Sequence, residues 1–442
     1  MTTTEPVSYG LIIRRAWPLI LANCSVPLLG LADTAVLGNL GSLYDLGAIA
    51  LGALIFSFVY WGFGFLRMGT TGFIAQADGR QDPAEVRAVM IRSLVLATAL
   101  GILLTLLQVP LAGVAFNLLG GSEQVEAIAR SYFLLRIWGA PATLGTFVLV
   151  GVLIGLGESK RLLLVQLFLN LLNIALDLYF AGYLRLGAQG VAMGTLVAEW
   201  SAFGFALWLV VRLLHKQHRD SEKFLVPDRL GDAKRMLAIL SANTDIMIRT
   251  VVLVFSFAWF TNQSARFGDV VLAANHILLQ LVSFSAFFLD GFAFVGESLV
   301  GRATGAGNGR LFDLAVRRTT VLAFATALVL ATLVATGGNQ LIADLTDIAL
   351  VQIAAMDMLY LAVIYILVSF AAFQLDGIFI GATRTVQMRN ASLAAGLIFL
   401  LGWWLLSSRY GITGLWLSFI LYVCARALTL LLYFPGLRKS IH

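Results

Sequence analysis

Gln76-Ala-Asp-Gly79 and Gly151-Val-Leu-Ile-Gly155 recur 226 residues further along the chain, as Arg302-Ala-Thr-Gly305 and Gly377-Ile-Phe-Ile-Gly381. Both pairs align without a gap, and chance agreement among small residues does not explain one offset repeated along the chain. The members of each pair fall on the same side of the expected membrane. The sequence therefore predicts two copies of one helical unit, related as parallel repeats about an axis along the membrane normal.

Composition identifies the class of protein. The chain has 442 residues, of which 60% are hydrophobic and only 12% charged, and its mean hydropathy is +0.89. A soluble domain is typically about one-quarter charged. The formal net charge of +6 does not indicate nucleic-acid binding, because the basic residues gather in short loops between apolar segments. No cofactor, disulfide or metal site is expected from the Cys and His residues.

The predicted fold is an all-α polytopic membrane protein with 12 transmembrane helices, arranged as two pseudo-symmetric six-helix bundles around a central cleft. Loops alternate between basic and acidic along the chain, and basic loops face the cytoplasm. This alternation predicts that both termini are cytoplasmic. The expected spans are 12–38, 46–75, 87–112, 126–155, 161–182, 188–214, 235–260, 268–300, 314–336, 349–381, 387–408 and 412–434.

The longest polar segment divides the two copies. It predicts an N-terminal lobe at 1–214, a cytoplasmic linker at 215–234 and a C-terminal lobe at 235–442. The charges of the linker are expected to be solvated and not to form a binding site.

A carboxylate, Asp33, lies inside the first apolar segment. An ionised Asp at membrane depth costs roughly 3 kcal/mol, so such a residue is by default functional. Pro18 and Pro27 precede it in the same segment, and a proline in a transmembrane helix can form a hinge. We expect a protonatable group beside a bend.

Helical rise converts sequence distance into depth, at about 1.5 Å per residue. Asp33 then lies roughly 27 Å beyond the cytoplasmic Arg15, and Asp177 of the fifth span lies at a similar level. Asn173 shares a helix face with Asp177, and Thr195 of the sixth span reaches the same layer. These four side chains form a candidate cation-coupling site. The alternative is that Asn173 and Thr195 are ordinary interhelical hydrogen-bonding residues and that Asp177 caps a helix.

Three further charges lie closer to the cytoplasm. Arg67 is equivalent under the repeat to Ala293, which lies between Asp290 and Glu297 of the eighth span. Equivalent helices of two lobes tend to face each other, so the hypothesis is an inner latch in which Arg67 pairs with Asp290 or Glu297. The alternative for Arg67 is that its side chain extends to the membrane surface.

Six short motifs, in this order and spacing, are similar to those of one family. They are Pro27-Leu-Leu-Gly-Leu-Ala-Asp33-Thr-Ala-Val, Phe65-Leu-Arg67-Met-Gly-Thr-Thr-Gly72, Gly120-Gly-Ser-Glu123, Asn173-Ile-Ala-Leu-Asp177, Leu289-Asp290-Gly-Phe-Ala293 and Leu375-Asp376-Gly-Ile-Phe-Ile-Gly-Ala-Thr-Arg384. Over nearly its full length the chain resembles the multidrug and toxic compound extrusion (MATE) family, in its bacterial DinF-type branch.

The resemblance implies a secondary active antiporter of the bacterial inner (plasma) membrane. Such a protein exports structurally diverse, often cationic or amphiphilic drugs or toxic metabolites in exchange for inward H⁺ or Na⁺. It implies that Asp33 is the coupling carboxylate, with Asn173, Asp177 and Thr195 beside it. Sodium-coupled relatives are associated with a Glu in span seven, whereas Asp245 is the only carboxylate of that span here. This difference favours H⁺ and leaves Na⁺ as the alternative. The expected partners are a small molecule and membrane lipid, with no nucleic acid, and the chain is expected to be monomeric.

Two other functions compete with multidrug export. A lipid-linked saccharide flippase of the same superfamily would tend to have extra spans and a strongly cationic cleft, whereas few intramembrane arginines are evident here. An intramembrane enzyme would need a nucleophile with a base, or a metal cluster, and His276 has no evident partner for either. No catalytic residue is therefore expected.

Overall fold

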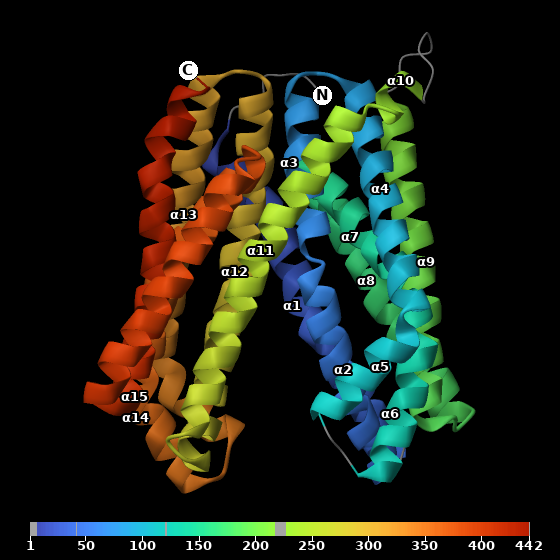
Figure 1. The fold of residues 1–442 in the computed structure, drawn as a ribbon, viewed down its shortest axis with the longest axis vertical. Coiled ribbons are helices and arrows are strands. Elements are labelled where there is room, and N and C mark those ends of the chain that lie inside the picture. The colour runs from blue at the N-terminus through green and yellow to red at the C-terminus, as the bar shows by residue number, and fades with distance from the viewer. Residues whose placement is uncertain (1–6, 41, 120–121, 217–226, 442) are drawn as a thin grey trace. The chain divides into compact units, whose positions relative to one another are not determined.

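The computed structural model describes residues 7–40, 42–119, 122–216 and 227–441, although the side chains of 28–29, 31–40, 43, 118–119 and 227–228 lie outside the description. Every secondary-structure element in this part of the chain is a helix, and short turns join the helices (Figure 1). The helices up to the linker are α1 (Tyr9–Leu40), α2 (Leu43–Gly62), α3 (Phe65–Gly79), α4 (Pro83–Leu106), α5 (Gln108–Leu119), α6 (Glu123–Arg136), η1 (Ile137–Gly139), α7 (Ala140–Gly155), α8 (Ser159–Asp177), η2 (Leu178–Tyr183) and α9 (Gly187–Lys216). The short α10 (Pro227–Leu230) lies within the predicted linker, and it is followed by α11 (Ala233–Ala265), α12 (Asp269–Gly305), α13 (Gly309–Leu345), α14 (Ala349–Gly381) and α15 (Thr385–Lys439).

The helices supply the twelve predicted spans. Among the described residues, ten helical segments are long and apolar enough to cross a membrane. The last of them, α15, contains two helices, because Gly411 interrupts it with φ 58° and ψ −131°. The 32-residue α1 adds the twelfth span. The protein is thus an all-α polytopic membrane protein, as predicted.

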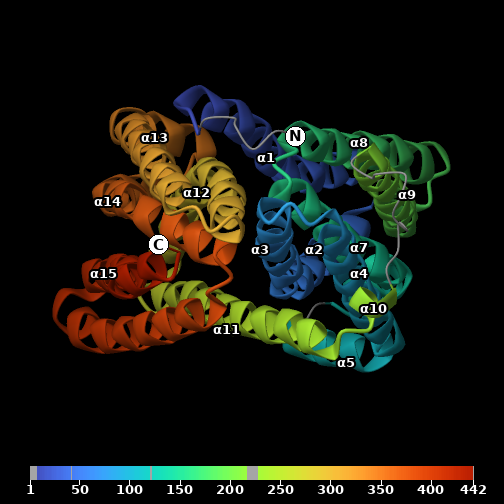
Figure 2. The same ribbon diagram turned by 90° about the horizontal axis from the view of Figure 1, so that it is seen from above.

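Contacts divide the chain into two compact units. The first unit is Leu21–Ile239, and the second unit is Met1–Ile20 together with Leu240–His442. In the second unit α12, α13 and α14 pack side by side (Figures 1 and 2). In the first unit α7 packs against α3, α4 and α9. The units differ from the lobes predicted at 1–214 and 235–442 because α1 and α11 each contribute residues to both units.

The backbone repeats the offset found in the sequence. Gln81 and Gly307 are 226 residues apart, and they adopt φ values of 57° and 60° after equivalent helices. Gly157 and Thr383, also 226 apart, adopt 72° and 52° after α7 and α14. Left-handed backbone conformations are uncommon outside glycine. Two pairs of them at the same offset are therefore strong evidence for duplicated structure.

Close helix packing repeats as well. A Cβ atom on Gly151 would lie 2.6 Å from the Arg67 carbonyl oxygen, and one on Gly377 would lie 2.6 Å from that of Ala293. Each glycine lets α7 or α14 approach the backbone of α3 or α12. Small residues at helix contacts are the usual means of close packing in membranes. The Gly-x-x-x-Gly motifs of the sequence are thus contacts within each unit.

The last helix of each unit aligns with an offset of 224. Gly187 begins α9 with φ 55°, and Gly411 begins the second helix of α15 with φ 58°. Three residues later, a Cβ on Gly190 or Gly414 would lie 2.8 Å from the backbone nitrogen of Ala181 or Ser407, respectively. This alignment identifies which residues of the two units occupy equivalent places.

Candidate functional site

Three of the four predicted coupling residues meet inside the first unit. The Asn173 amide on α8 donates a hydrogen bond to the Thr195 hydroxyl on α9, with 3.1 Å between nitrogen and oxygen. Asn173 and Asp177 are completely buried, and Thr195 is 2% exposed. Among the described residues no group of three or more His, Cys, Asp or Glu side chains could hold a metal ion. The buried layer consists of the amide of Asn173, the hydroxyl of Thr195 and the carboxylate of Asp177.

A glycine brings α9 against the Asp177 carboxylate. A Cβ atom on Gly194 would collide with Asp177 Oδ1 and would lie 3.2 Å from the Asp177 backbone nitrogen. Gly194 directly precedes Thr195. Because Gly194 has no side chain, α9 can approach α8 closely at this layer. Gly194 is not among the residues predicted for the site. The spacing of Gly190 and Gly194, four residues apart on one helix face, was the available signal.

Asp177 ends an α-helix where the backbone widens. The next six residues, η2, form a π-helical turn, and the Leu184 amide donates to the Tyr179 carbonyl at 2.9 Å. Such turns are rare and are frequent at functional sites. The carboxylate therefore lies at the junction of two helix types, where the backbone can be reshaped more readily than in a continuous α-helix.

The side chain of Asp33 lies outside the described residues, although its backbone belongs to α1. This helix runs through Pro18 and Pro27 without a break in the described backbone, so the hinge stays a prediction. The Asn170 amide on α8 donates to the Ser25 carbonyl at 3.0 Å, two residues before Pro27. This bond fixes α8 to α1 beside the predicted hinge.

The inner latch also stays a prediction. Arg67 belongs to the first unit, whereas Asp290 and Glu297 belong to the second. Glu297 is 1% exposed, and Asp290 and Arg67 are half-buried. The relation between the two units lies outside what the structure describes, so no distance tests the pairing.

A buried ion pair that the sequence analysis missed lies one turn from Thr195. Glu199 on α9 is 8% exposed, and its Oε1 is 3.7 Å from Nη2 of Arg136 at the end of α6. Arg136 also donates to the Tyr132 hydroxyl at 2.8 Å and stacks 4.5 Å from the centre of the Phe56 ring. Each charge lies inside an apolar span of the sequence, which was the available signal, but the packing of α6 against α9 decides that they pair.

The second unit buries a different set of charges. Asp376 on α14 is 5% exposed, and its Oδ2 accepts hydrogen bonds from Arg249 on α11 and Arg426 on α15. Few intramembrane arginines were expected, but the structure buries Arg249 and Arg426 within spans and half-buries Arg136. The sequence shows Arg249 and Arg426 inside predicted spans, but it does not show that both pair with Asp376, because the three residues come from different helices. Asp376 is thus part of a buried charge cluster.

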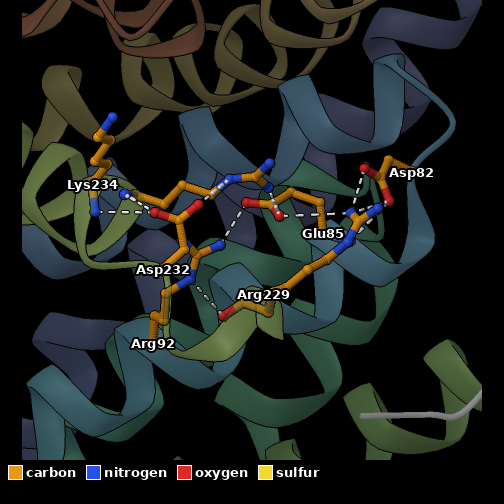
Figure 3. Close-up of polar contacts among 8 residues, drawn as sticks. Asp82, Glu85, Arg92, Arg229, Asp232 and Lys234 are labelled. Atoms are coloured by element: carbon orange, nitrogen blue, oxygen red, sulfur yellow. Dashed lines mark hydrogen bonds and ion pairs between the residues drawn. The ribbon is translucent and has the colours of Figure 1, made fainter. Parts of the chain in front are cut away.

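Charged residues join the end of the linker to the first unit (Figure 3). Arg229 Nη1 of α10 is 2.5 Å from Asp82 Oδ2, at the start of α4. Glu85 accepts from Arg92 at 2.5 Å and also from Arg235. Burial raises the pKa of the Asp82 carboxyl, but the hydrogen bonds from Arg229 and from the Glu85 backbone outweigh it and hold the pKa below its usual range. This surface cluster explains why residues up to Ile239 group with the first unit.

Comparison with known proteins places the chain among membrane transporters. The MatE family of sequences matches residues 18–179 and 246–404. The chain is 37% identical over 420 residues to DNA damage-inducible protein F of Escherichia coli (strain K12), covering 94% of this chain and 89% of that protein. It is 28% identical over 304 residues to the probable multidrug resistance protein NorM of Thermotoga maritima, covering 67% and 63% of the two chains.

Solved structures share the fold. A crystal structure of MATE in the bent conformation superposes with a TM-score of 0.85 at 20% identity and covers 100% of this chain and 98% of that one. A MOP superfamily transporter from Pyrococcus furiosus Vc1 (DSM3638) superposes at 0.84, with 20% identity and coverage of 100% and 99%. The reverse polarity of the binding pocket of that protein is described as suggesting a different function.

Proposed function

Because this chain belongs to the MatE family, we propose that it exports drug-like, often cationic or amphiphilic, small molecules in exchange for inward protons by alternating access. The resemblance to MATE proteins is confirmed, and the chain is a multi-pass membrane efflux transporter and not an enzyme. The observation that carries the proton proposal is the fully buried layer of Asn173, Asp177 and Thr195 in the first unit.

A buried carboxyl can couple proton movement to a change of shape. Burial disfavours the charged form of Asp177, so protonation relieves an electrostatic cost. Asp33 is the proposed second carboxyl of the same layer. Each proton that moves inward supplies about 1.4 kcal/mol per unit of pH difference and about 2.3 kcal/mol per 100 mV. Sodium is the alternative coupling ion, because the same oxygens could bind it.

We place the shape change in α1. Neutralising Asp33 removes a charge one to two turns beyond Pro27, where the missing backbone donor weakens the helix. The bond from Asn170 to Ser25 fixes the helix just before that point. Solved structures of MATE described as bent and as straight support bending as the step to test in this chain.

Orientation and partners follow from the loops and the fold. We place the chain in a bacterial inner membrane as a monomer, with lipid around it and with both termini cytoplasmic. Its basic loops support this orientation. The transported molecule would then be taken up from the cytoplasm.

A flippase is the second candidate function, and the buried arginines favour it. Arg249 and Arg426 leave their cluster with one net positive charge after pairing with Asp376. A related structure with reverse pocket polarity, described as suggesting a different function, makes the charge of the substrate worth testing. Export of a cationic dye from vesicles, competed with anionic lipid-linked sugars, would separate the two substrates.

The decisive experiment is substrate transport in everted membrane vesicles under an imposed pH or Na⁺ gradient. We expect Asp33→Asn to abolish proton-driven uphill transport, because the variant cannot carry the proton. Asp347→Asn, an exposed residue of the second unit, is the matched control and should transport like the wild type. Uphill proton-driven transport by Asp33→Asn would contradict the proposal, and a response to the Na⁺ gradient alone would reassign the coupling ion.

A further inference from the structure

We propose that Glu199 is a second proton-binding carboxyl of the first unit, separate from the layer of Asn173, Asp177 and Thr195. Its use in transport rests on the proton-driven export proposed above, whereas proton binding itself does not. Glu199 was outside the predicted site, and the geometry around it is that of a carboxyl poised between its charged and neutral forms.

The carboxyl is buried and incompletely satisfied. Glu199 is 8% exposed, and within the described part of the chain its Oε2 has no hydrogen-bond partner. An unsatisfied buried acceptor costs about 1–3 kcal/mol, and more when it is charged. Protonation of Glu199 removes the cost of burying a charged oxygen that lacks a hydrogen bond.

Hydroxyl groups that can share such a proton are close by. Thr143 of α7 lies near Glu199 and near Tyr60 of α2, although neither contact has hydrogen-bond geometry. The buried hydroxyl oxygens of Thr143 and Tyr60 both lack partners among the residues described. Protonation of Glu199 turns its free acceptor into a donor, which either hydroxyl oxygen can accept.

Arg136 holds the charged form in balance. Its guanidinium is 3.7 Å from Glu199, which is close enough to attract the carboxylate but longer than a hydrogen bond. The hydrogen bond to Tyr132 and the stacking on Phe56 hold the guanidinium at that place. Burial therefore favours the neutral carboxyl while Arg136 favours the charged one. The other titratable groups facing this region are Tyr60 and Tyr132.

An interrupted helix lies against the carboxyl. The 3₁₀ turn η1 interrupts the span between α6 and α7, and a Cβ atom on Gly139 in that turn would collide with Glu199 Oε2. Interrupted helices are where transporters build ion sites. Glu199 also follows Thr195 by one helical turn, which puts both on the same face of α9. The site is thus connected to the coupling layer through one helix.

The step itself is a simple proton transfer. A hydronium ion transfers its proton to Oε2: one of its O–H bonds breaks, a new O–H bond forms at the carboxyl, a neutral water molecule is left, and the carboxylate loses its negative charge. Arg136 keeps its proton, so the net charge of the pair changes from zero to +1. Release reverses the step.

Infrared difference spectroscopy between acid and neutral pH tests this with protons as the only probe. The full chain is studied in lipid nanodiscs, where each protonated carboxyl contributes a carbonyl band. We expect Glu199→Gln to remove one band that Asp177→Asn and the control Glu123→Gln, an exposed residue of α6, both retain. Arg136→Gln should move the midpoint of that band upward by about 1–3 pH units, because the stabilising charge is lost.

Unchanged spectra in Glu199→Gln would overturn the proposal. Should Glu199→Gln fail to fold, the midpoint in Arg136→Gln still decides, since an unmoved midpoint would overturn it as well. Failure of proton-driven transport with the Glu199 band intact would instead overturn the proposed function and leave this site standing.

Discussion

The two units have the same backbone plan but opposite chemistry at one place. Where the first unit has Asn173 hydrogen-bonded to Thr195, the second has Phe399 and Phe419, whose ring centroids are 6.0 Å apart. Asp177 likewise corresponds to Trp403, by the offset of 226. Duplication therefore supplied two equivalent helix pairs, and only the first carries a polar layer. The comparison teaches that the fold needs the packing but not the polarity.

The units also differ in helix continuity. The first unit breaks its spans at Phe63–Gly64, at Leu107 and at η1, whereas α12, α13 and α14 are continuous. Breaks free backbone groups and permit bending, and in membranes they are tolerated where protein or a cavity surrounds them. The buried carboxyls Asp177 and Glu199 lie in the broken unit. We infer that the first unit moves ions and that the buried charges of the second serve mainly stability.

The largest expected effect tests the structural role of the second unit. Asp376→Asn leaves Arg249 and Arg426 buried without their counter-charge, which should cost about 3–5 kcal/mol of unfolding free energy. Thermal unfolding of the purified protein measures it. Asp357→Asn, exposed on the same helix, is the control and should change stability by less than about 0.5 kcal/mol. Wild-type stability of Asp376→Asn would show that the cluster of Asp376, Arg249 and Arg426 does not stabilise the fold.

The second prediction replaces Asn173 of the first unit by phenylalanine, the residue at the equivalent position of the second unit. Asn173→Phe removes the donor to Thr195 and overpacks the buried layer by about 1–3 kcal/mol. Ion-driven export should be lost while folded protein remains. Leu171→Phe introduces the same ring at a position that is 66% exposed on the same helix, and it should export normally. Normal export by Asn173→Phe would mean that the polar layer is incidental.

The third prediction concerns helix approach. Gly194→Ala adds a Cβ atom that collides with the Asp177 carboxylate, and the equivalent residue of the second unit, Ser418, already carries one. We expect about a 10-fold loss in the rate of coupled export, which corresponds to about 1.4 kcal/mol. Gly204→Ala, on the same helix with no atom within 4 Å of the added Cβ, should match the wild type. Equal export rates for Gly194→Ala and Gly204→Ala would show that the packing around Asp177 does not affect coupled export.

The smallest effect is at the cytoplasmic surface. Asp82 and Asn308 are equivalent helix caps, but only Asp82 is charged and paired with Arg229. The pKa of Asp82 is lower in the folded state than in the unfolded state, so its contribution is complete above about pH 4 and is lost as pH falls through the folded-state value. Asp82→Asn keeps the cap and should cost about 0.2–1 kcal/mol near neutral pH.

The stability difference between Asp82→Asn and wild type, measured by thermal unfolding, should disappear at acid pH. Asn308→Asp is the matched exchange in the second unit. Because no arginine contact is recorded for Asn308 in the described structure, this variant should not acquire the same stabilisation above pH 4. A pH-independent difference for Asp82→Asn would show that its charge does not matter.

The sequence alone determined the number of spans and the repeat, and it predicted one common depth for three of the polar residues. The bilayer fixes one dimension, and constant helical rise translates sequence position into that dimension, so Asn173, Asp177 and Thr195 were correctly brought together. Only the tertiary structure decided which faces meet around each helix. The pairing of Glu199 with Arg136 and of Asp376 with two arginines depends on packing between distant segments. Glycines at positions such as Gly194 set that packing, because backbone approach is limited by a single Cβ atom.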